Sequence, residues 1–259
     1  MKPLAALDAA PVKAVLFDID DTLTTSGKLT AEAYGALEAL KRAGKLVVPV
    51  TGRPAGWCDH IARMWPVDAV VGENGAFYFR LAAGRIEKRF RDDAGARAKQ
   101  RARLAAIGDR ILAAVPGCAL ASDQPYRETD LAIDYCEDVP PLPLAAAERI
   151  AALMRSAGLH AKVSSIHVNG WFGDYDKLAM TRLLFAEGFG WNLEARNREV
   201  AFAGDSPNDA PMFAFFENSV GVANLRRFES LSFERPKYLT SAAAGAGFAE
   251  LAQQLLRAK

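Results

Sequence analysis

Short apolar runs, each followed at once by polar or glycine-rich residues, recur along the first part of the chain. These are 13–17 before Asp18-Ile19-Asp20-Asp21, 46–50 before Thr51-Gly52-Arg53, and 68–71 before Gly72-Glu73-Asn74-Gly75. Runs of this length predict buried strands, and the segments 30–43 and 55–65 between them predict helices. Such alternation is typical of a parallel sheet whose strands present their carboxyl ends at one edge. Residues 1–11 are predicted to be a loose leader.

The pattern of apolar positions changes in the middle of the chain. Two runs at 77–79 and 86–90, separated by Ala83-Gly84, predict a β-hairpin. Further on, helices are predicted at 96–114 and 144–157, and strands at 118–122, 129–136, 160–165 and 166–171. Because helices and antiparallel strands are mixed here, we predict an inserted α+β domain over residues 93–170.

The opening pattern returns in the last third of the chain. The predicted elements are helices at 175–187, 210–215 and 246–257, and strands at 199–203 and 218–222. The first of these strands is followed by Gly204-Asp205-Ser206-Pro207-Asn208-Asp209, another polar strand end. We therefore predict an α/β protein, with a discontinuous Rossmann-like parallel-sheet core formed by residues 1–92 and 171–259.

Composition narrows the range of partners and the location. Thirty-two Lys and Arg balance 31 Asp and Glu, giving a net charge of +1, so neither nucleic-acid nor membrane-surface binding is indicated. No apolar stretch approaches the length of a membrane span, and the N-terminus lacks the pattern of a signal peptide. Three cysteines without C-x-x-C spacing favour a reducing compartment. We expect a soluble cytoplasmic protein; whether it is a monomer or a homodimer stays open.

Each polar cluster alone has a structural explanation. The aspartates after residue 17 suit an Asx-type turn, Thr51 suits a helix cap, and Lys177 on a helix is usually solvated. In a parallel sheet, however, these groups would converge in one crevice. Carboxylates, a hydroxyl and a lysine together suit phosphoryl transfer, because Mg²⁺ prefers oxygen ligands and a carboxylate can attack phosphorus.

The four clusters, taken in order, resemble the four motifs of the haloacid dehalogenase (HAD) superfamily. The matching residues are Asp18-Ile19-Asp20-Asp21-Thr22-Leu23, Thr51-Gly52-Arg53, Lys177 and Gly204-Asp205-Ser206-Pro207-Asn208-Asp209. An insertion between the second and third motifs resembles the Cof-type branch, subfamily IIB. That branch includes sugar-phosphate phosphatases and phosphomannomutases, and its fold is a HAD core with an inserted α+β cap domain.

The resemblance implies a role for each motif residue. Asp18 would be the nucleophile and a Mg²⁺ ligand; Asp20 would be the acid and base, with its carbonyl on the metal. Thr51 and the Gly52 amide would hold the phosphoryl group, and Lys177 would neutralise Asp18 and the phosphate. Asp205 would bind Mg²⁺, Asp209 would act at the metal or just behind it, and Asn208 would touch the phosphate. Asp21 stands where many relatives have glycine and receives no chemical role.

Other residues are candidates for contact with the substrate. Arg53 either binds substrate or pairs with an acid beneath the site. In the inserted domain, Arg127 could hold a second anionic group, although Arg127, Glu128 and Asp130 also fit a solvated charge cluster.

Two more candidates come from strand positions and turns. His167 and Asn169 could bond sugar hydroxyls, with His167 facing either the crevice or solvent, opposite to Ile166 and Val168. Asn74 suits a turn as well as a substrate contact.

The resulting functional hypothesis is a Mg²⁺-dependent phosphatase that acts on a small phosphorylated metabolite, with sugar phosphates as the expected class. A phosphomutase would use the same aspartyl-phosphate and return the phosphoryl group to the sugar. A non-catalytic metabolite-binding relative is the third alternative. None of the motif positions is replaced, which favours an intact enzyme.

Overall fold

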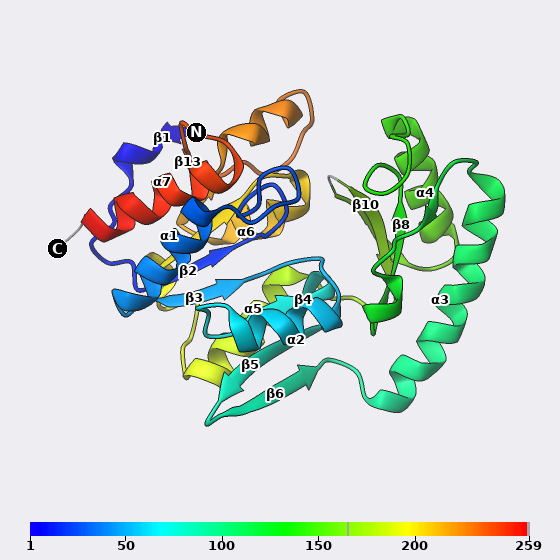
Figure 1. Cartoon of the computed structure of the whole chain (residues 1–259), viewed down its shortest axis with the longest axis horizontal. Helices are drawn as coiled ribbons and strands as arrows, with labels where there is room; N and C mark the ends of the chain where they lie inside the picture. The colour runs from blue at the N-terminus through cyan, green and yellow to red at the C-terminus, as the bar shows by residue number, and fades with distance from the viewer. Residues whose placement is uncertain (165, 258–259) are drawn as a thin grey trace.

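The protein has two lobes in the computed structural model, which describes residues 1–164 and 166–257 (Figure 1). The larger lobe contains a parallel sheet with helices on both faces. The smaller lobe, drawn in green, contains an antiparallel sheet whose helices lie on the side away from the larger lobe. The predicted α/β class, with a parallel central sheet and additional antiparallel strands, is confirmed.

The central sheet of the larger lobe has six strands, and all of its pairings are parallel. In order across the sheet they are β1 (Lys2–Pro3), β13 (Tyr238–Leu239), β12 (Asn218–Gly221), β11 (Val200–Gly204), β2 (Ala14–Phe17) and β3 (Leu46–Pro49). The strands β2 and β11 are neighbours although they lie far apart in the sequence. Their carboxyl ends, with the polar residues that follow, therefore lie side by side.

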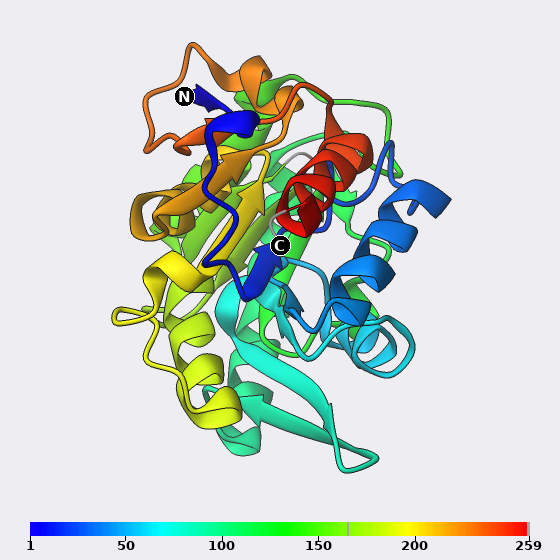
Figure 2. The same cartoon turned by 90° about the vertical axis from the view of Figure 1, so that its left-hand side faces the viewer.

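Helices cover both faces of this sheet (Figure 2). On one side are α1 (Ala31–Arg42) and α7 (Ala244–Arg257), and on the other α5 (Lys177–Phe189) and α6 (Ala210–Phe215). Alternate residues of β2 serve the two faces: Val15 and Phe17 belong to the first core, Leu16 to the second. This explains why the strand is apolar throughout, because both of its faces are buried.

A three-stranded antiparallel sheet extends the larger lobe. It contains β4 (Val70–Gly72), β5 (Phe77–Ala82) and β6 (Arg85–Phe90), and α2 (Ala55–Met64) packs on it. A parallel bridge between Val50 and Val71 joins this sheet to the edge of the central one. The predicted hairpin is confirmed in β5 and β6.

The smaller lobe is built on four antiparallel strands and two helices. The strands, in order, are β7 (Ala119–Leu120), β8 (Asp130–Asp134), β10 (His167–Trp171) and β9 (His160–Val163), and the helices are α3 (Ala94–Ala114) and α4 (Leu144–Ser156). Leu131, Ile133 and Val168 pack into the apolar core with the helices. The alternate positions Asp130, His167 and Asn169 occupy the opposite sheet face, which is turned toward the larger lobe (Figure 1).

Short 3-10 turns connect several of these elements. They are η1 (Leu4–Ala6), η2 (Glu73–Gly75), η3 (Gln124–Tyr126), η4 (Asn197–Glu199), η5 (Pro207–Asp209) and η6 (Ala223–Phe228).

The prediction of a loose leader is wrong. Residues Lys2–Pro3 form a strand beside β13, and the Lys2 amide donates to the Lys237 carbonyl at 2.7 Å. Leu4 and Leu7 are both 4% exposed and join the core that includes α7. Burial of these two apolar side chains holds the segment against the larger lobe.

Smaller differences concern the lengths of predicted elements. The strand expected at 118–122 shrinks to two residues, and β13 and η6 were not predicted. The last predicted residue of the strand 160–165 lies outside the described residues.

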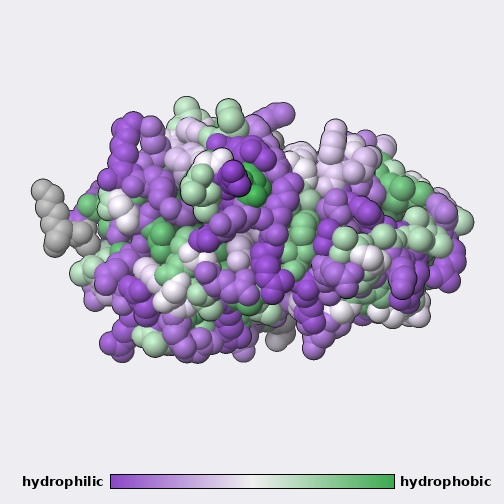
Figure 3. All heavy atoms as spheres, turned by 90° about the horizontal axis from the view of Figure 1, so that it is seen from below, coloured by the Kyte–Doolittle hydropathy of each residue, from purple (hydrophilic) through white to green (hydrophobic). Residues whose placement is uncertain are grey.

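The surface shows no single apolar face on the side drawn in Figure 3, where hydrophobic residues form small separate patches among hydrophilic ones. Among the described residues, no helix is both long and apolar enough to cross a membrane.

Candidate active site

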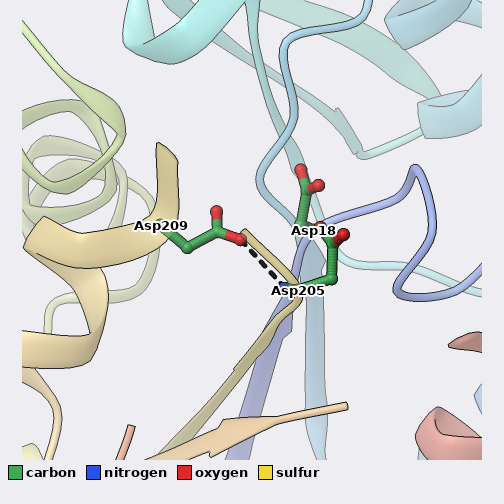
Figure 4. A group of neighbouring side chains, drawn as sticks. All are labelled: Asp18, Asp205 and Asp209. Carbon is green, nitrogen blue, oxygen red and sulfur yellow. Dashed lines mark hydrogen bonds between the residues drawn. The ribbon is translucent and has the colours of Figure 1, made fainter. Parts of the chain in front are cut away.

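Three buried carboxylates meet where β2 and β11 end (Figure 4). Asp18 follows β2, Asp205 follows β11, and Asp209 ends the turn η5. One carboxylate oxygen from each lies within 4.8 Å of the others. The Asp205 amide donates to Asp209 Oδ2 at 3.2 Å. A Cβ on Gly204 would lie 2.4 Å from that same oxygen, so the glycine is needed for Asp209 to fold back over the strand end.

Lys177 lies between two of these carboxylates. Its Nζ is 2.9 Å from Asp18 Oδ1 and 2.8 Å from Asp209 Oδ1. The lysine is the first residue of α5, which is capped by the Asp176 side chain. Gly75 makes this position possible, because a Cβ there would lie 2.0 Å from the Asp176 carbonyl oxygen. Burial opposes the charge on Lys177, but Asp18 and Asp209 outweigh it and raise the pKa of the ammonium group.

The carboxylates carry more negative charge than the lysine compensates. Burial raises the pKa of Asp18 to about 7, against the opposing effect of Lys177. Burial, and then Asp209, raise the pKa of Asp205 well above its usual value. A divalent cation would relieve this repulsion, and a set of carboxylate oxygens suits a hard ion such as Mg²⁺. The donor set therefore fits the metal that the motifs imply.

Asp21 adopts a left-handed backbone with φ of 56°. Aspartate tolerates this conformation, and glycine adopts it without cost. The Asp21 carboxylate lies 3.3 Å from Arg227 Nη2, and the same nitrogen lies 2.7 Å from Asp205 Oδ2. Arg227 in η6 was not singled out in the sequence, because no motif surrounds it.

Asp20 is held by Arg53. The Arg53 Nε donates to Asp20 Oδ2 at 2.9 Å, and Nη2 donates to Oδ1 at 2.9 Å. Arg53 is 4% exposed, and its guanidinium stacks on the Trp57 ring at 4.4 Å. Arg53 was expected either to bind substrate or to pair with an acid. The structure shows that it pairs with the acid Asp20, and it also borders the cavity described below.

The smaller lobe reaches Arg53 through Glu137, which follows β8. Arg53 Nη2 donates to Glu137 Oε1 at 2.9 Å, and His167 Nε2 lies 2.8 Å from Glu137 Oε2. Contact with His167, and then with Arg53, lowers the pKa of Glu137 to about 2. His167 is 2% exposed and faces the crevice rather than solvent. Glu137 was missed because nothing in the sequence shows that it reaches across to Arg53.

Arg127 is buried between two aspartates. Its Nε and Nη2 donate to Asp123 at 2.9 and 3.0 Å, and Nη1 donates to Asp130 Oδ1 at 2.9 Å. Nη1 also donates to the Gly52 carbonyl at 3.0 Å, across the two lobes. Asn169 Nδ2 donates to Asp130 Oδ2 at 3.0 Å. The alternative of a solvated charge cluster is wrong for Arg127 and Asp130, which are 5% and 2% exposed.

A small cavity separates the two lobes above the carboxylates. Its lining residues are Asp18, Asp20, Gly52, Arg53, Asn74, Arg127, Ser164, Ile166, His167, Asn169, Asp205, Ser206 and Asn208. It has a volume of about 30 Å³, which is enough for roughly one or two water molecules. Thr51 is fully buried beneath it, and its hydroxyl accepts from the Arg53 amide at 3.0 Å.

Asn74 presents an unused donor at this cavity. Its backbone is left-handed with φ of 57°, as a turn requires. Its Oδ1 accepts from Asn208 Nδ2 at 3.4 Å. The buried Nδ2 has no hydrogen-bond partner among the residues that the structure describes. A buried donor without a partner is costly, so this amide suits an anionic oxygen bound in the cavity.

Glu73 joins the lobes from below the cavity and was also missed in the sequence. Its carboxylate accepts the amides of Ala55, Glu128 and Thr129 at 2.9, 2.9 and 2.6 Å, and the Thr129 hydroxyl as well. Burial, and then Asp130, raise the pKa of Glu73 to about 7, against the lowering effect of Arg127 and of these donors. Its hydrogen-bond partners are all donors, which a carboxylate can accept.

Glu73→Gln is expected to destabilise the protein by about 2 kcal/mol, because the new amide group would face N–H donors and leave at least one unsatisfied. Urea denaturation followed by circular dichroism would measure the loss. Glu87→Gln is the matched control. Glu87, in β6, is exposed and forms an ion pair with Arg80. Equal stabilities of the two variants would contradict the role of Glu73 as a buried acceptor.

The comparisons with known proteins agree with this architecture. The sequence matches the haloacid dehalogenase-like hydrolase family over residues 12–216. The chain therefore belongs to the haloacid dehalogenase-like hydrolases, and the assignment made from the motifs is confirmed. No curated protein matches the sequence.

Solved structures share the fold at low sequence identity. A Thermoplasma acidophilum protein designated 0175 has a TM-score of 0.70 at 17% identity, covering 95% of this chain and 98% of that one. The C-terminal domain of trehalose-6-phosphate phosphatase from C. albicans has a TM-score of 0.70 at 14% identity, covering 98% of both chains. Sucrose-phosphatase from Synechocystis sp. PCC6803 has a TM-score of 0.62 at 14% identity, covering 93% of this chain and 97% of that chain.

Proposed function

We propose that the protein is a Mg²⁺-dependent phosphatase that hydrolyses a small phosphorylated metabolite through an aspartyl-phosphate. One observation carries the proposal: Asp18 lies at the cavity floor, against Lys177 and within reach of Asp205 and Asp209. A carboxylate nucleophile, a fixed cation and a site for a metal are what phosphoryl transfer requires.

The chain's own residues would carry the two steps. In the first, an Asp18 oxygen attacks phosphorus, the bond to the leaving oxygen breaks, and Asp20 gives that oxygen a proton. In the second, Asp20 takes a proton from water, the water oxygen attacks phosphorus, and the bond to Asp18 breaks. Phosphate is released and both carboxyl groups return to their starting states.

Other residues would bind and orient the phosphoryl group. Lys177 would neutralise the negative charges of Asp18 and of the phosphoryl group. The Gly52 amide, the Thr51 hydroxyl, Asn74 Nδ2 and Asn208 would donate to the phosphoryl oxygens. Arg53 would orient Asp20. Asp18, Asp205 and the Asp20 carbonyl would hold Mg²⁺, which supplies positive charge for the phosphoryl oxygens when bound. Both oxygens of Asp209 already accept hydrogen bonds, so we place Asp209 just behind the metal.

The smaller lobe would act as a cap, for which we propose the boundaries 93–170. With about 30 Å³, the cavity is too small for a phosphorylated metabolite, so the lobes must separate to admit one. The contacts of Arg53 with Glu137 and of Arg127 with the Gly52 carbonyl would close the cap afterwards and exclude water. In that closed state His167 and Asn169 would line the cavity that holds the phosphoryl group.

The substrate class is proposed from the relatives that share the fold. The neighbours include enzymes named for trehalose 6-phosphate and sucrose phosphate, one of them in complex with sucrose and phosphate. Sugar phosphates are therefore the first compounds to test. We also propose a cytoplasmic location, from the odd number of cysteines without metal spacing.

A phosphate-release screen over phosphorylated sugars and other metabolites tests the proposal. We expect release well above background, with a ranking by kcat/KM that identifies the substrate class. Interconversion of hexose phosphate isomers without release would identify a phosphomutase instead. Absence of any turnover across the panel would indicate a binding protein.

Removal of the metal is expected to lower kcat at least about hundredfold, since a bound cation contributes several kcal/mol to a phosphoryl-transfer transition state. Phosphate release would be measured after treatment with a chelator and again after Mg²⁺ is added back. Calcium serves as the control, because it is larger and accepts less regular coordination. Full activity in excess chelator would contradict a metal-dependent site.

A further inference from the structure

An open groove adjoins the catalytic cavity on the side of Asp20. It has a volume of about 500 Å³ and lies between the segment 19–29, which follows β2, and the helix α2. Its apolar wall includes Leu29, Trp57, Ile61 and Trp65, and Tyr126 of the smaller lobe closes one side. We call this surface the aromatic groove.

The groove and the catalytic cavity share two residues, Asp20 and Arg53. Asp20 is the residue that would give a proton to the leaving oxygen, so the organic part of a substrate must emerge beside it. Two other hollows share Asn208 with the cavity, but Asp20 lines neither. The position of the acid therefore selects the aromatic groove as the place for the leaving group.

Capacity agrees with this choice but does not make it, because the hollow that includes Asn208 and Arg227 has a similar volume of about 530 Å³. The catalytic cavity offers about 30 Å³ and the groove about 500 Å³. Binding sites for small molecules commonly have volumes of roughly 300–1,000 Å³. In the closed arrangement of the lobes, the groove can hold an organic group and the cavity cannot.

The chemistry of the lining favours a flat apolar ring. Trp57 and Tyr126 are large and yet 43% and 59% exposed. Arg53 stacks on the Trp57 ring and so holds it in place. The polar groups at the inner end are already paired, since Arg53 donates to Asp20 and the Thr24 hydroxyl donates to the Ile19 carbonyl. The other polar side-chain groups of the lining include His60 and the Tyr126 hydroxyl. A ring with hydroxyls all round would find few partners there, whereas an aryl ring would bury apolar surface against aromatic faces.

We propose that the aromatic groove is a leaving-group subsite, and that the preferred substrates carry a flat apolar ring on the alcohol side of the phosphate ester. This inference rests on the proposed phosphatase function. It departs from the simple sugar phosphates that the neighbours suggest, and it places an aryl-bearing part of the released alcohol between the larger lobe and Tyr126.

The test compares two esters with primary alcohol leaving groups, propyl phosphate and 2-phenylethyl phosphate. We expect kcat/KM of the wild type to be at least about tenfold higher for the phenylethyl ester, the range that an apolar pocket provides for added apolar atoms. Trp57→Ala and Tyr126→Ala should each reduce this ratio severalfold. The ratio is the readout because Trp57 also supports Arg53, and any effect on the chemistry would change both rates equally.

The control variant is Tyr34→Ala. Tyr34 is another exposed aromatic residue, 36% accessible, on α1 and outside the lining of the groove. Its replacement should leave the ratio unchanged.

Each alternative result is decisive. Equal kcat/KM for the two esters, or a ratio that both groove variants preserve, would overturn the subsite and leave the phosphatase function standing. Release from a hexose phosphate but from neither ester would also overturn it. If no ester and no member of the metabolite panel releases phosphate, the proposed function itself fails.

Discussion

Asp18→Asn is expected to lower the rate of phosphate release by at least about 10⁴-fold, the scale seen when an enzyme loses its nucleophile. The amide keeps the shape of the carboxylate but cannot form the aspartyl-phosphate. Asp18 is 8% exposed and lines the cavity. Phosphate release measured with the best substrate of the screen would give the value.

Asp21→Asn is the matched control for this experiment. It removes the same charge three residues further along, and asparagine accepts the left-handed backbone at that position. The variant loses an ion pair with Arg227 that is partly exposed, which is worth little. We expect activity within a few-fold of the wild type. Similar activity of Asp18→Asn and the wild type would show that Asp18 is not the nucleophile.

Lys177→Met is expected to destabilise the protein by about 3–5 kcal/mol, because it leaves two buried carboxylates without their shared partner. The rate of phosphate release should also fall at least about a thousandfold, through loss of a fixed positive charge at the phosphoryl group. Urea denaturation would measure the first effect. Kinetic assays on folded protein, verified by circular dichroism, would measure the second.

Lys88→Met is the control for Lys177. Lys88 forms an ion pair with Asp59 at 2.9 Å, but its side chain is 46% exposed, so its loss should cost less than about 1 kcal/mol. Equal stability and activity of the two variants would contradict the proposed role of Lys177 as the shared cation of Asp18 and Asp209.

The parallel sheet could be predicted because its strands β2, β3 and β11 are apolar runs in the sequence, each followed closely by polar or glycine-rich residues. The same strand ends, with their order along the chain, led to the correct family. Asp18 and Asp205 could be expected to be neighbours, since both follow strands of one parallel sheet. The roles proposed for them still depend on the experiments above.

The contacts between the lobes could not be predicted from the sequence. Glu137, Asp123 and Glu73 are ordinary acidic residues in the sequence, and only the three-dimensional arrangement places them against Arg53, Arg127 and Thr129. Burial of Arg127 was missed for the same reason: a short run of charges is usually solvated. The leader was missed because its two buried leucines pack against a helix at the other end of the chain.

The order of strands in the central sheet has a consequence for how the chain folds. The strand β2 is paired with β11, and the segments between them include the whole smaller lobe. All four strands of that lobe come from one continuous segment, so its pairings close shorter loops. During synthesis the smaller lobe can therefore assemble before the central sheet is complete, while β2, which pairs on its other side with β3, waits for β11. The buried carboxylates Asp18, Asp205 and Asp209 come together only when part of the last third of the chain has been made.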